Sequence, residues 1–309
     1  MSKEIEEKLE TIPVIRNGAR YLKTVKLKWL EGLSLYELME IYIVGIAEGA
    51  VTYRAAAIAF SFFMALFPFA LFILNLIPYI PIEGFQADFL RFVEESVPPR
   101  TYDAIATIIN DILNNSHSGL LSSGFLLSIF VMANGLNSVL GGFETSQHVL
   151  VKRGFFRQYF VALALSLLLS FLLLFTVAII VVFEVIIQSS SIQDVLSDKI
   201  PLIVWGRYVF LMMMILFTSS IMLKFGTKHT GKRSFISIGS VFTTILIILS
   251  SYAFGIWAVK FSKYNELYGS IGTLLILMFY IWLNCVILLL GFELNAAVNR
   301  IKRKNLFTT

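Results

Sequence analysis

Six long runs of apolar residues dominate the hydropathy pattern of the chain. Each run has close to the roughly 20 helical residues that cross a bilayer core, and each carries few or no charges. The runs are Ala55–Ile77, Leu120–Phe143, Tyr159–Phe183, Leu202–Leu223, Phe235–Val259 and Ser270–Phe292. The pattern predicts an all-α membrane bundle of six transmembrane helices, and because six is even, both termini are expected on the same side.

The distribution of lysine and arginine predicts which side this is, because positively charged loops resist translocation. Apart from Arg54 and Arg207, which lie beside or inside a run, eighteen of the 25 basic residues lie before the first run, between the second and third, between the fourth and fifth, or after the sixth. Five lie in the other connections. We therefore expect both termini in the cytoplasm. Residues 1–47 begin with charged residues and lack an apolar signal-peptide core, so they are interpreted as a cytosolic segment.

Two segments outside the runs also show helical patterns. Ser34-Leu-Tyr-Glu37 has the form of a capping box and predicts an interfacial helix from about Leu35 to Glu48. Segment 79–119 is acidic, and its apolar residues recur at helical spacing, which predicts amphipathic helices on the outer surface. The expected organisation is a cytoplasmic segment 1–47, a transmembrane domain 48–299 that includes 79–119, and a basic cytoplasmic tail 300–309.

Composition excludes an ordinary soluble enzyme and a metal or disulfide framework. Hydrophobic residues make up 57% of the chain and charged residues 15%, against about 25% charged in soluble domains. One cysteine and three scattered histidines supply no ligand cluster, so no metal or other cofactor is expected. The net charge of +5 is interpreted as a topology signal and a possible attraction to anionic lipids, because no basic patch with stacking aromatics predicts nucleic-acid binding.

Ionisable residues in or beside the runs are candidates for function, since each costs about 2.5–3.5 kcal/mol to insert at the centre of a helix. Arg54, Glu144 and Glu293 lie at the cytoplasmic ends of three runs. Glu184 and Arg207 flank the outer loop between the third and fourth runs and are predicted to form an outer ion pair. The alternative for both arginines is that they extend to the lipid headgroups.

Polar residues in the middle or cytoplasmic half of the first, second and sixth runs suggest a polar vestibule open to the cytoplasm. The predicted substrate-binding residues are Arg54, Ser61, Asn134, Asn137, Asn284 and Glu293. Amides and charges need partners in hydrocarbon, which is why these positions stand out. The equally weighted alternative is a set of independent hydrogen bonds between helices, each worth less than about 2 kcal/mol.

Small residues and one proline predict close helix packing and a kink in the first span. Pro68 removes a backbone hydrogen bond to Met64. Glycines allow two helices to approach closely, and the second run is rich in them. The predicted packing or gating residues are Pro68, Gly135, Gly141, Gly142, Tyr268, Gly269, Gly272 and Gly291.

Two stretches, Arg54–Phe69 and Tyr264–Ala296, resemble the first and last spans of the YihY/BrkB family of bacterial inner-membrane proteins. The specific elements are Tyr268-Gly269-Ser-Ile-Gly272 and Gly291-Phe-Glu293-Leu-Asn295-Ala296. The resemblance covers roughly Leu35 to Val298. Ala65 stands where many members have serine, so a role for that serine hydroxyl could not operate here. Tyr280 and Trp282 stand where the family pattern has tryptophan first and tyrosine second.

The resemblance implies a membrane protein whose biochemical activity is not established, with transport as the usual suggestion. Some members once carried a ribonuclease label, which we reject because the chain lacks clustered ligands for catalytic metal ions. The first hypothesis is a transporter or lipid-handling protein whose partners are membrane lipids and an anionic small molecule or headgroup. The second is a non-catalytic scaffold for envelope proteins. An intramembrane enzyme is the weakest hypothesis, since no catalytic constellation can be named.

Overall fold

The computed structural model describes most of the six apolar runs and parts of their connections. The described residues are 36, 50–76, 87, 90–91, 94, 118–146, 149, 152–188, 200–228, 234–260 and 270–306. Within these ranges the chain is helical with short connections, and no strand occurs in them. The predicted all-α class is therefore confirmed for the described part.

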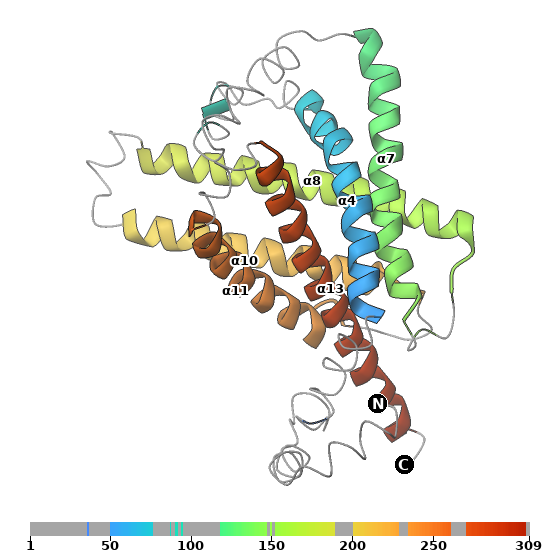
Figure 1. Ribbon diagram of the computed structural model, residues 1–309. Helices are drawn as coiled ribbons and strands as arrows, with labels where there is room; N and C mark the ends of the chain where they lie inside the picture. Colours follow the sequence, from blue (N-terminus) through green and yellow to red (C-terminus); the bar gives the residue numbers. More distant parts are fainter. Residues whose placement is uncertain are drawn as a thin grey trace.

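Each of the six predicted runs forms a helix (Figure 1). In chain order the helices are α4 (Ala50–Leu76), α7 (Ser118–Glu144), α8 (Phe155–Gln188), α10 (Ile200–Phe225), α11 (Ile238–Lys260) and α13 (Ser270–Leu306). Among the described residues, four segments are long and apolar enough to cross a membrane: Phe155–Phe183, Val204–Phe225, Ile238–Trp257 and Leu274–Asn299. Val51–Leu66 of α4 is a shorter apolar segment. Crossing by all six helices stays a prediction.

Neighbour relations among the helices close into a ring. α4 packs on α7, α7 on α8, α8 on α10, α10 on α11, α11 on α13, and α13 returns to α4. Figure 1 shows α4 and α7 side by side, with α8 crossing them steeply and α10 running alongside α8. Each described helix thus packs on the next one in the chain, and the first and last close the ring.

Some helix boundaries differ from the apolar runs because local hydrogen bonds and helix propensity decide where a helix ends. α11 begins at Ile238 instead of Phe235, since Ser237 caps it: the Ser240 backbone N donates to Ser237 Oγ (3.1 Å), and the Ser237 backbone N donates to Ser240 Oγ (2.9 Å). α13 continues past Phe292 to Leu306, because no glycine or proline follows Gly291 to stop it. Most of the predicted basic tail is therefore the last turns of this helix.

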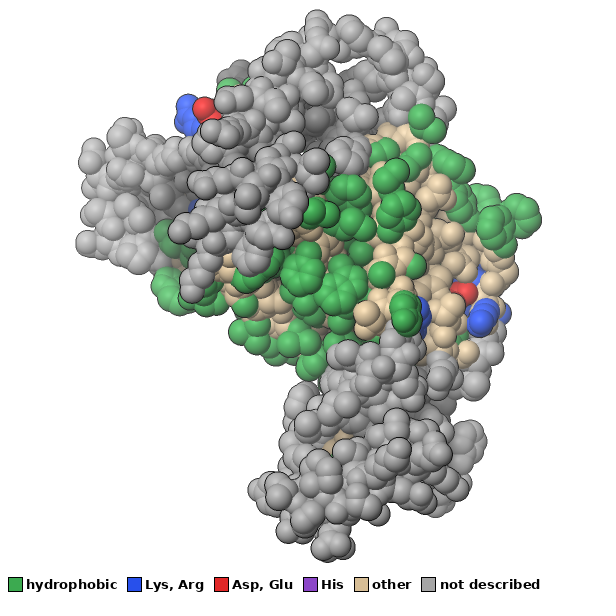
Figure 2. All heavy atoms as spheres, in the orientation of Figure 1, with side chains coloured by type: hydrophobic (Ala, Val, Ile, Leu, Met, Phe, Trp, Pro, Cys, Tyr) green, Lys and Arg blue, Asp and Glu red, His purple; other side chains and the backbone are tan. Residues whose placement is uncertain are grey.

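The best-packed part of the bundle lies where α4, α7 and α13 meet. The rings of Phe143 and Phe292 stack with centroids 4.5 Å apart, and Leu140 and Leu289 are fully buried. Large apolar side chains elsewhere point outward, among them Phe160, Trp205 and Tyr252. Figure 2 shows hydrophobic side chains spread over the visible face of the described helices, with charged side chains at few positions. Such a surface suits contact with lipid and not with water.

Glycines bring several helices of the ring into close contact, among them Gly135, Gly142 and Gly291. A Cβ at Gly135 would lie 2.8 Å from that of Ala65, so the alanine that departs from the family pattern fits against α7. A Cβ at Gly142 would lie 2.5 Å from Cδ1 of Ile58. Gly291 of α13 meets α11 in the same way. Side chains at these positions would push the helices apart.

Several predictions concern residues outside the described part of the chain. Tyr268 and Gly269 are not among the described residues, nor is most of the predicted interfacial helix, of which Tyr36 alone is described, in a helical turn. Of segment 79–119, the described residues Ala87, Leu90, Arg91 and Glu94 are helical, as are those that begin α7. Pro68 lies inside α4, which continues through it.

Candidate functional site

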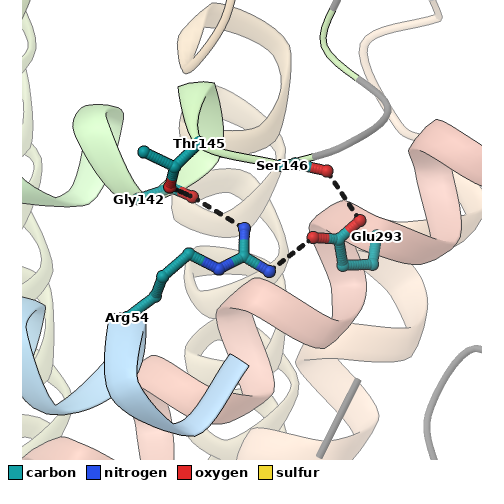
Figure 3. Close-up of polar contacts among 5 residues, drawn as sticks. All are labelled: Arg54, Gly142, Thr145, Ser146 and Glu293. Carbon is teal, nitrogen blue, oxygen red and sulfur yellow. Dashed lines mark hydrogen bonds and ion pairs between the residues drawn. The ribbon is translucent and has the colours of Figure 1, made fainter. Parts of the chain in front are cut away.

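Arg54 reaches from the first turns of α4 to two other helices (Figure 3). Its Nη1 donates to the backbone oxygen of Gly142 at 3.0 Å, and its Nη2 lies 2.7 Å from Oε1 of Glu293 on α13. The guanidinium therefore joins the start of α4, the end of α7 and the second half of α13. It does not extend freely to the headgroups, which was the alternative interpretation of this residue.

The Glu293 carboxylate uses both of its oxygens. Oε1 takes the ion pair with Arg54, and Oε2 accepts a hydrogen bond from Ser146 Oγ at 2.8 Å (Figure 3). The side chains of Arg54 and Glu293 are 17% and 9% exposed. Removing one partner of such a sheltered pair leaves an uncompensated charge, which costs about 3–5 kcal/mol in buried sites.

The end of α7 supplies acceptors for this site because the last carbonyls of a helix have no partner within the helix. The Gly142 carbonyl accepts from Arg54 and from Thr145 Oγ1, the latter at 3.0 Å. The turn that follows places Ser146 against Glu293. Since Gly142 also lets α7 approach α4, one glycine brings both the helix and the acceptor within reach of Arg54.

A second polar cluster at the same end of the bundle ties the α7–α8 connection to the end of α10. Arg153 donates through Nη1 to the Gly226 oxygen (3.0 Å) and through Nη2 to the Phe225 oxygen (2.8 Å). Its backbone N lies 3.3 and 3.4 Å from the two carboxylate oxygens of the buried Glu144. Burial lowers the pKa of Arg153, and the negative charge of Glu144 opposes that shift. Glu144 thus helps to hold the α7–α8 connection in place.

Several of the predicted vestibule residues have different surroundings in the structure. Ser61 is half-buried on α4 and Asn134 is exposed on α7. Asn137 Oδ1 accepts from Gln158 Nε2 at 3.0 Å, and Asn284 Nδ2 donates to the Tyr280 oxygen of its own helix at 2.8 Å. Of the six predicted substrate-binding residues, Arg54 and Glu293 are thus the two that bond to each other, and substrate binding by any of the six stays a prediction.

The remaining predicted positions are Arg207, Glu184, Gly141 and Gly272. The guanidinium carbon of Arg207 lies 5.4 Å from the ring centroid of Tyr208. The side chain of Glu184 lies outside the described residues, so the predicted outer ion pair stays a prediction. Gly141 faces the Gln158 side chain, with 3.7 Å between Nε2 and the place of an added Cβ, and Gly272 is buried.

Sequence reasoning missed Ser146 and Arg153 as members of these clusters. In the sequence, Arg153 stands out only as one of the positive charges between the second and third apolar runs. Ser146 follows an apolar run in which serines are common. A signal was available for Ser146, because it lies two residues after a carboxylate at a helix end, where hydroxyls often bond locally. Nothing in the sequence shows that its partner is Glu293, 147 positions away.

Within the described ranges, no group of three or more histidine, cysteine, aspartate or glutamate side chains is arranged to hold a metal ion. The polar groups found together at this end of the bundle are an ion pair, hydroxyls and backbone carbonyls. Such groups can bind and release charged species and can hold a proton on a carboxylate.

Known proteins resemble this chain over most of its length. The family model described as virulence factor BrkB matches residues 43–307. A Bacillus subtilis (strain 168) protein, YfkH, whose name describes it as ribonuclease-like, is 27% identical over 254 residues, covering 81% of this chain and 90% of its own. UPF0761 membrane proteins of Coxiella burnetii (strain Dugway 5J108-111) and Aggregatibacter aphrophilus (strain NJ8700) are 24% and 22% identical, covering 79% and 84% of this chain and 86% and 91% of their own. No solved structure matches.

Proposed function

The chain belongs to the virulence factor BrkB family, as its first and last spans predict, and on that premise we propose that it transports or handles an anionic species in the cytoplasmic membrane. Both termini lie in the cytoplasm in this proposal. The Arg54–Glu293 pair is the observation that carries it, because it places an arginine and a titratable carboxylate together where three helices of a membrane protein meet. The ligand class is a carboxylate or phosphate, including a lipid headgroup.

Arg54 is suited to an exchange of anions. A guanidinium binds carboxylate or phosphate through a planar fork of donors, and here one arm of that fork already holds a carboxylate. An incoming anion would replace Glu293 on Nη2 and keep the site neutral when Glu293 takes up a proton. Ser146 would remain beside the released, protonated carboxyl group of Glu293 to hold it.

This exchange predicts opposite effects for the two members of the pair. Arg54→Ala removes the cation and should abolish anion binding. Glu293→Gln removes the competing carboxylate and should strengthen anion binding, by tenfold for each 1.4 kcal/mol of competition removed. The gain in the second variant is informative because a misfolded protein would not show it.

The test uses native mass spectrometry of the purified full chain with two short-chain probes, dihexanoyl phosphatidylglycerol and dihexanoyl phosphatidylcholine. We expect wild type to prefer the anionic probe, Arg54→Ala to lose that preference, and Glu293→Gln to increase it. Arg157→Ala is the matched control, because it removes one positive charge from an exposed side chain at the start of α8, the same end of the bundle. Equal binding in all four proteins would contradict the proposal and favour the scaffold hypothesis.

The scaffold hypothesis makes a different prediction. It depends on segment 79–119, most of which lies outside the described residues. Deleting Gln86–Leu113 should then abolish function in a complementation assay, while Arg54→Ala should be tolerated. The transport proposal predicts that Arg54→Ala fails in that assay at normal expression.

A further inference from the structure

A cavity of about 450 Å³ is bordered by five of the six helices of the ring. Phe62 of α4, Leu136 of α7, Leu172 of α8, Met214 of α10 and Ile247 of α11 are among its lining residues. Four of them lie within two residues of the middle of their helices, and Leu136 lies five residues beyond the middle of α7. If these helices cross the membrane, the cavity therefore lies at the depth of the lipid chains.

The lining offers almost nothing to a polar ligand. Most of the lining side chains are apolar, and two of its hydroxyls are already used within their own helix. Ser166 Oγ donates to the Leu163 oxygen at 2.8 Å, and Thr176 Oγ1 donates to the Leu172 oxygen at 2.7 Å. A trapped water needs about 2–4 polar partners, so this space disfavours water. Its volume falls in the roughly 300–1,000 Å³ range of small-molecule sites.

We propose that this cavity binds an acyl chain of a membrane lipid. An apolar space in a protein either stays empty, losing contact energy along its walls, or takes an apolar ligand. In the middle of a bilayer the surrounding molecules are acyl chains, and a flexible chain fits a cavity bordered by several crossing helices. Large apolar side chains are exposed along the described helices, so the described part of the surface offers the lipid an apolar face next to the cavity.

The cavity also lies at a suitable distance from the Arg54–Glu293 pair. Phe62 is eight residues beyond Arg54 on α4, which corresponds to about 12 Å along a helix with a rise of 1.5 Å per residue. One lipid could place its headgroup at Arg54 and a chain in the cavity. This link to the headgroup rests on the proposed function, whereas the chain site itself does not.

Two neighbouring methionines of α10 provide a matched pair of variants. Met214 lines the cavity, whereas Met213 is 52% exposed on the outer face of the same helix. Met214→Trp should fill the cavity, and Met213→Trp adds the same indole outside it. Leu172→Trp and Leu168→Trp form a second pair on α8, because Leu172 lines the cavity and Leu168 is 45% exposed.

The experiment is photolabelling of the purified full chain, in mild detergent, with phosphatidylglycerol or phosphatidylcholine carrying a diazirine in the middle of one acyl chain. We expect saturable labelling of residues that line the cavity in wild type, as located by peptide mass spectrometry. Met214→Trp and Leu172→Trp should each reduce this labelling at least fivefold, while Met213→Trp and Leu168→Trp should leave it unchanged. Labels on lipid-exposed residues alone, or cavity labels that both filling variants leave intact, would overturn the proposal.

The wild-type label map keeps the test decisive even if a filling variant does not fold. It also separates the two proposals. Cavity labelling that is equal for both lipids and unchanged in Arg54→Ala supports the chain site and contradicts the link to a headgroup at Arg54, whereas the anion site itself is tested by the short-chain probes. A preference for short-chain phosphatidylglycerol without cavity labelling supports the anion site and contradicts the chain site. The cavity would then be empty or occupied by another part of the chain.

Discussion

Gly291 of α13 lies against Thr243 of α11 so closely that an added Cβ would overlap the Thr243 hydroxyl. Gly239, one turn before Thr243, has its own backbone within the same contact. Two helices in lipid gain little from hydrophobic burial, so close backbone approach is a main source of their attraction. This contact therefore determines how α11 sits on α13, two residues from Glu293.

Gly291→Ala is expected to destabilise the protein, because the new methyl group must push the two helices apart. We expect a loss of about 1–3 kcal/mol, as for other overpacked sites. The measurement is the free energy of unfolding by SDS titration in mixed micelles. Gly255→Ala is the control on α11, since nothing lies within 4 Å of its added Cβ. Equal losses in both variants would show that the contact is not tight.

Arg54→Ala is expected to cost about 3 kcal/mol of unfolding free energy, since Glu293 would stay sheltered without its cation. Glu293→Gln should cost less, because its neutral amide still has Ser146 nearby. The double variant should lose less than the sum of the two single losses, with a coupling energy of about 1–3 kcal/mol. Strict additivity in this cycle, measured by SDS titration, would mean that the pair contributes no mutual stabilisation.

Asn295→Ala is expected to loosen the start of α11. Asn295 Oδ1 accepts from the Gly239 backbone N at 2.8 Å, and its Nδ2 donates to Ser237 Oγ at 2.7 Å, so α13 supplies part of the cap of α11. Loss of both bonds should cost about 1–2 kcal/mol. Asn299→Ala is the control, because its amide donates to the Asn295 oxygen of its own helix. Hydrogen exchange of the Gly239 and Ser240 amides should rise in the first variant and stay unchanged in the second.

Asn134 and Asn137 should respond differently to leucine. Asn137→Leu removes the acceptor of Gln158 and should lower thermal stability. Asn134 is exposed on α7, and no hydrogen bond of its side chain occurs among the described residues, so Asn134→Leu should leave thermal stability unchanged or raise it. A loss of stability on Asn134→Leu, or a change in subunit number by native mass spectrometry, would instead show that another chain or segment satisfies this amide in the intact protein.

Much of the fold could be predicted from the sequence. Each of the six apolar runs is a helix, because a chain in hydrocarbon must satisfy its backbone hydrogen bonds within each segment. The ends were less predictable: the cap at Ser237 leaves the first residues of that apolar run, Phe235 and Ile236, outside α11, and α13 continues beyond its apolar run. Arg54 and Glu293 were identified as candidates because charges are costly beside a membrane span.

The helical class, the apolar runs and the family follow from the sequence alone, since these depend on composition, length and short motifs. Which polar residues meet depends on how the helices pack. Rotation and approach of neighbouring helices bring Arg54 to Glu293 and leave Asn134 on an exposed face, although all three share one predicted region. That rotation depends on contacts such as Gly135 with Ala65, which act between residues far apart in the chain. Hydropathy, which describes each segment alone, contains no information about such contacts.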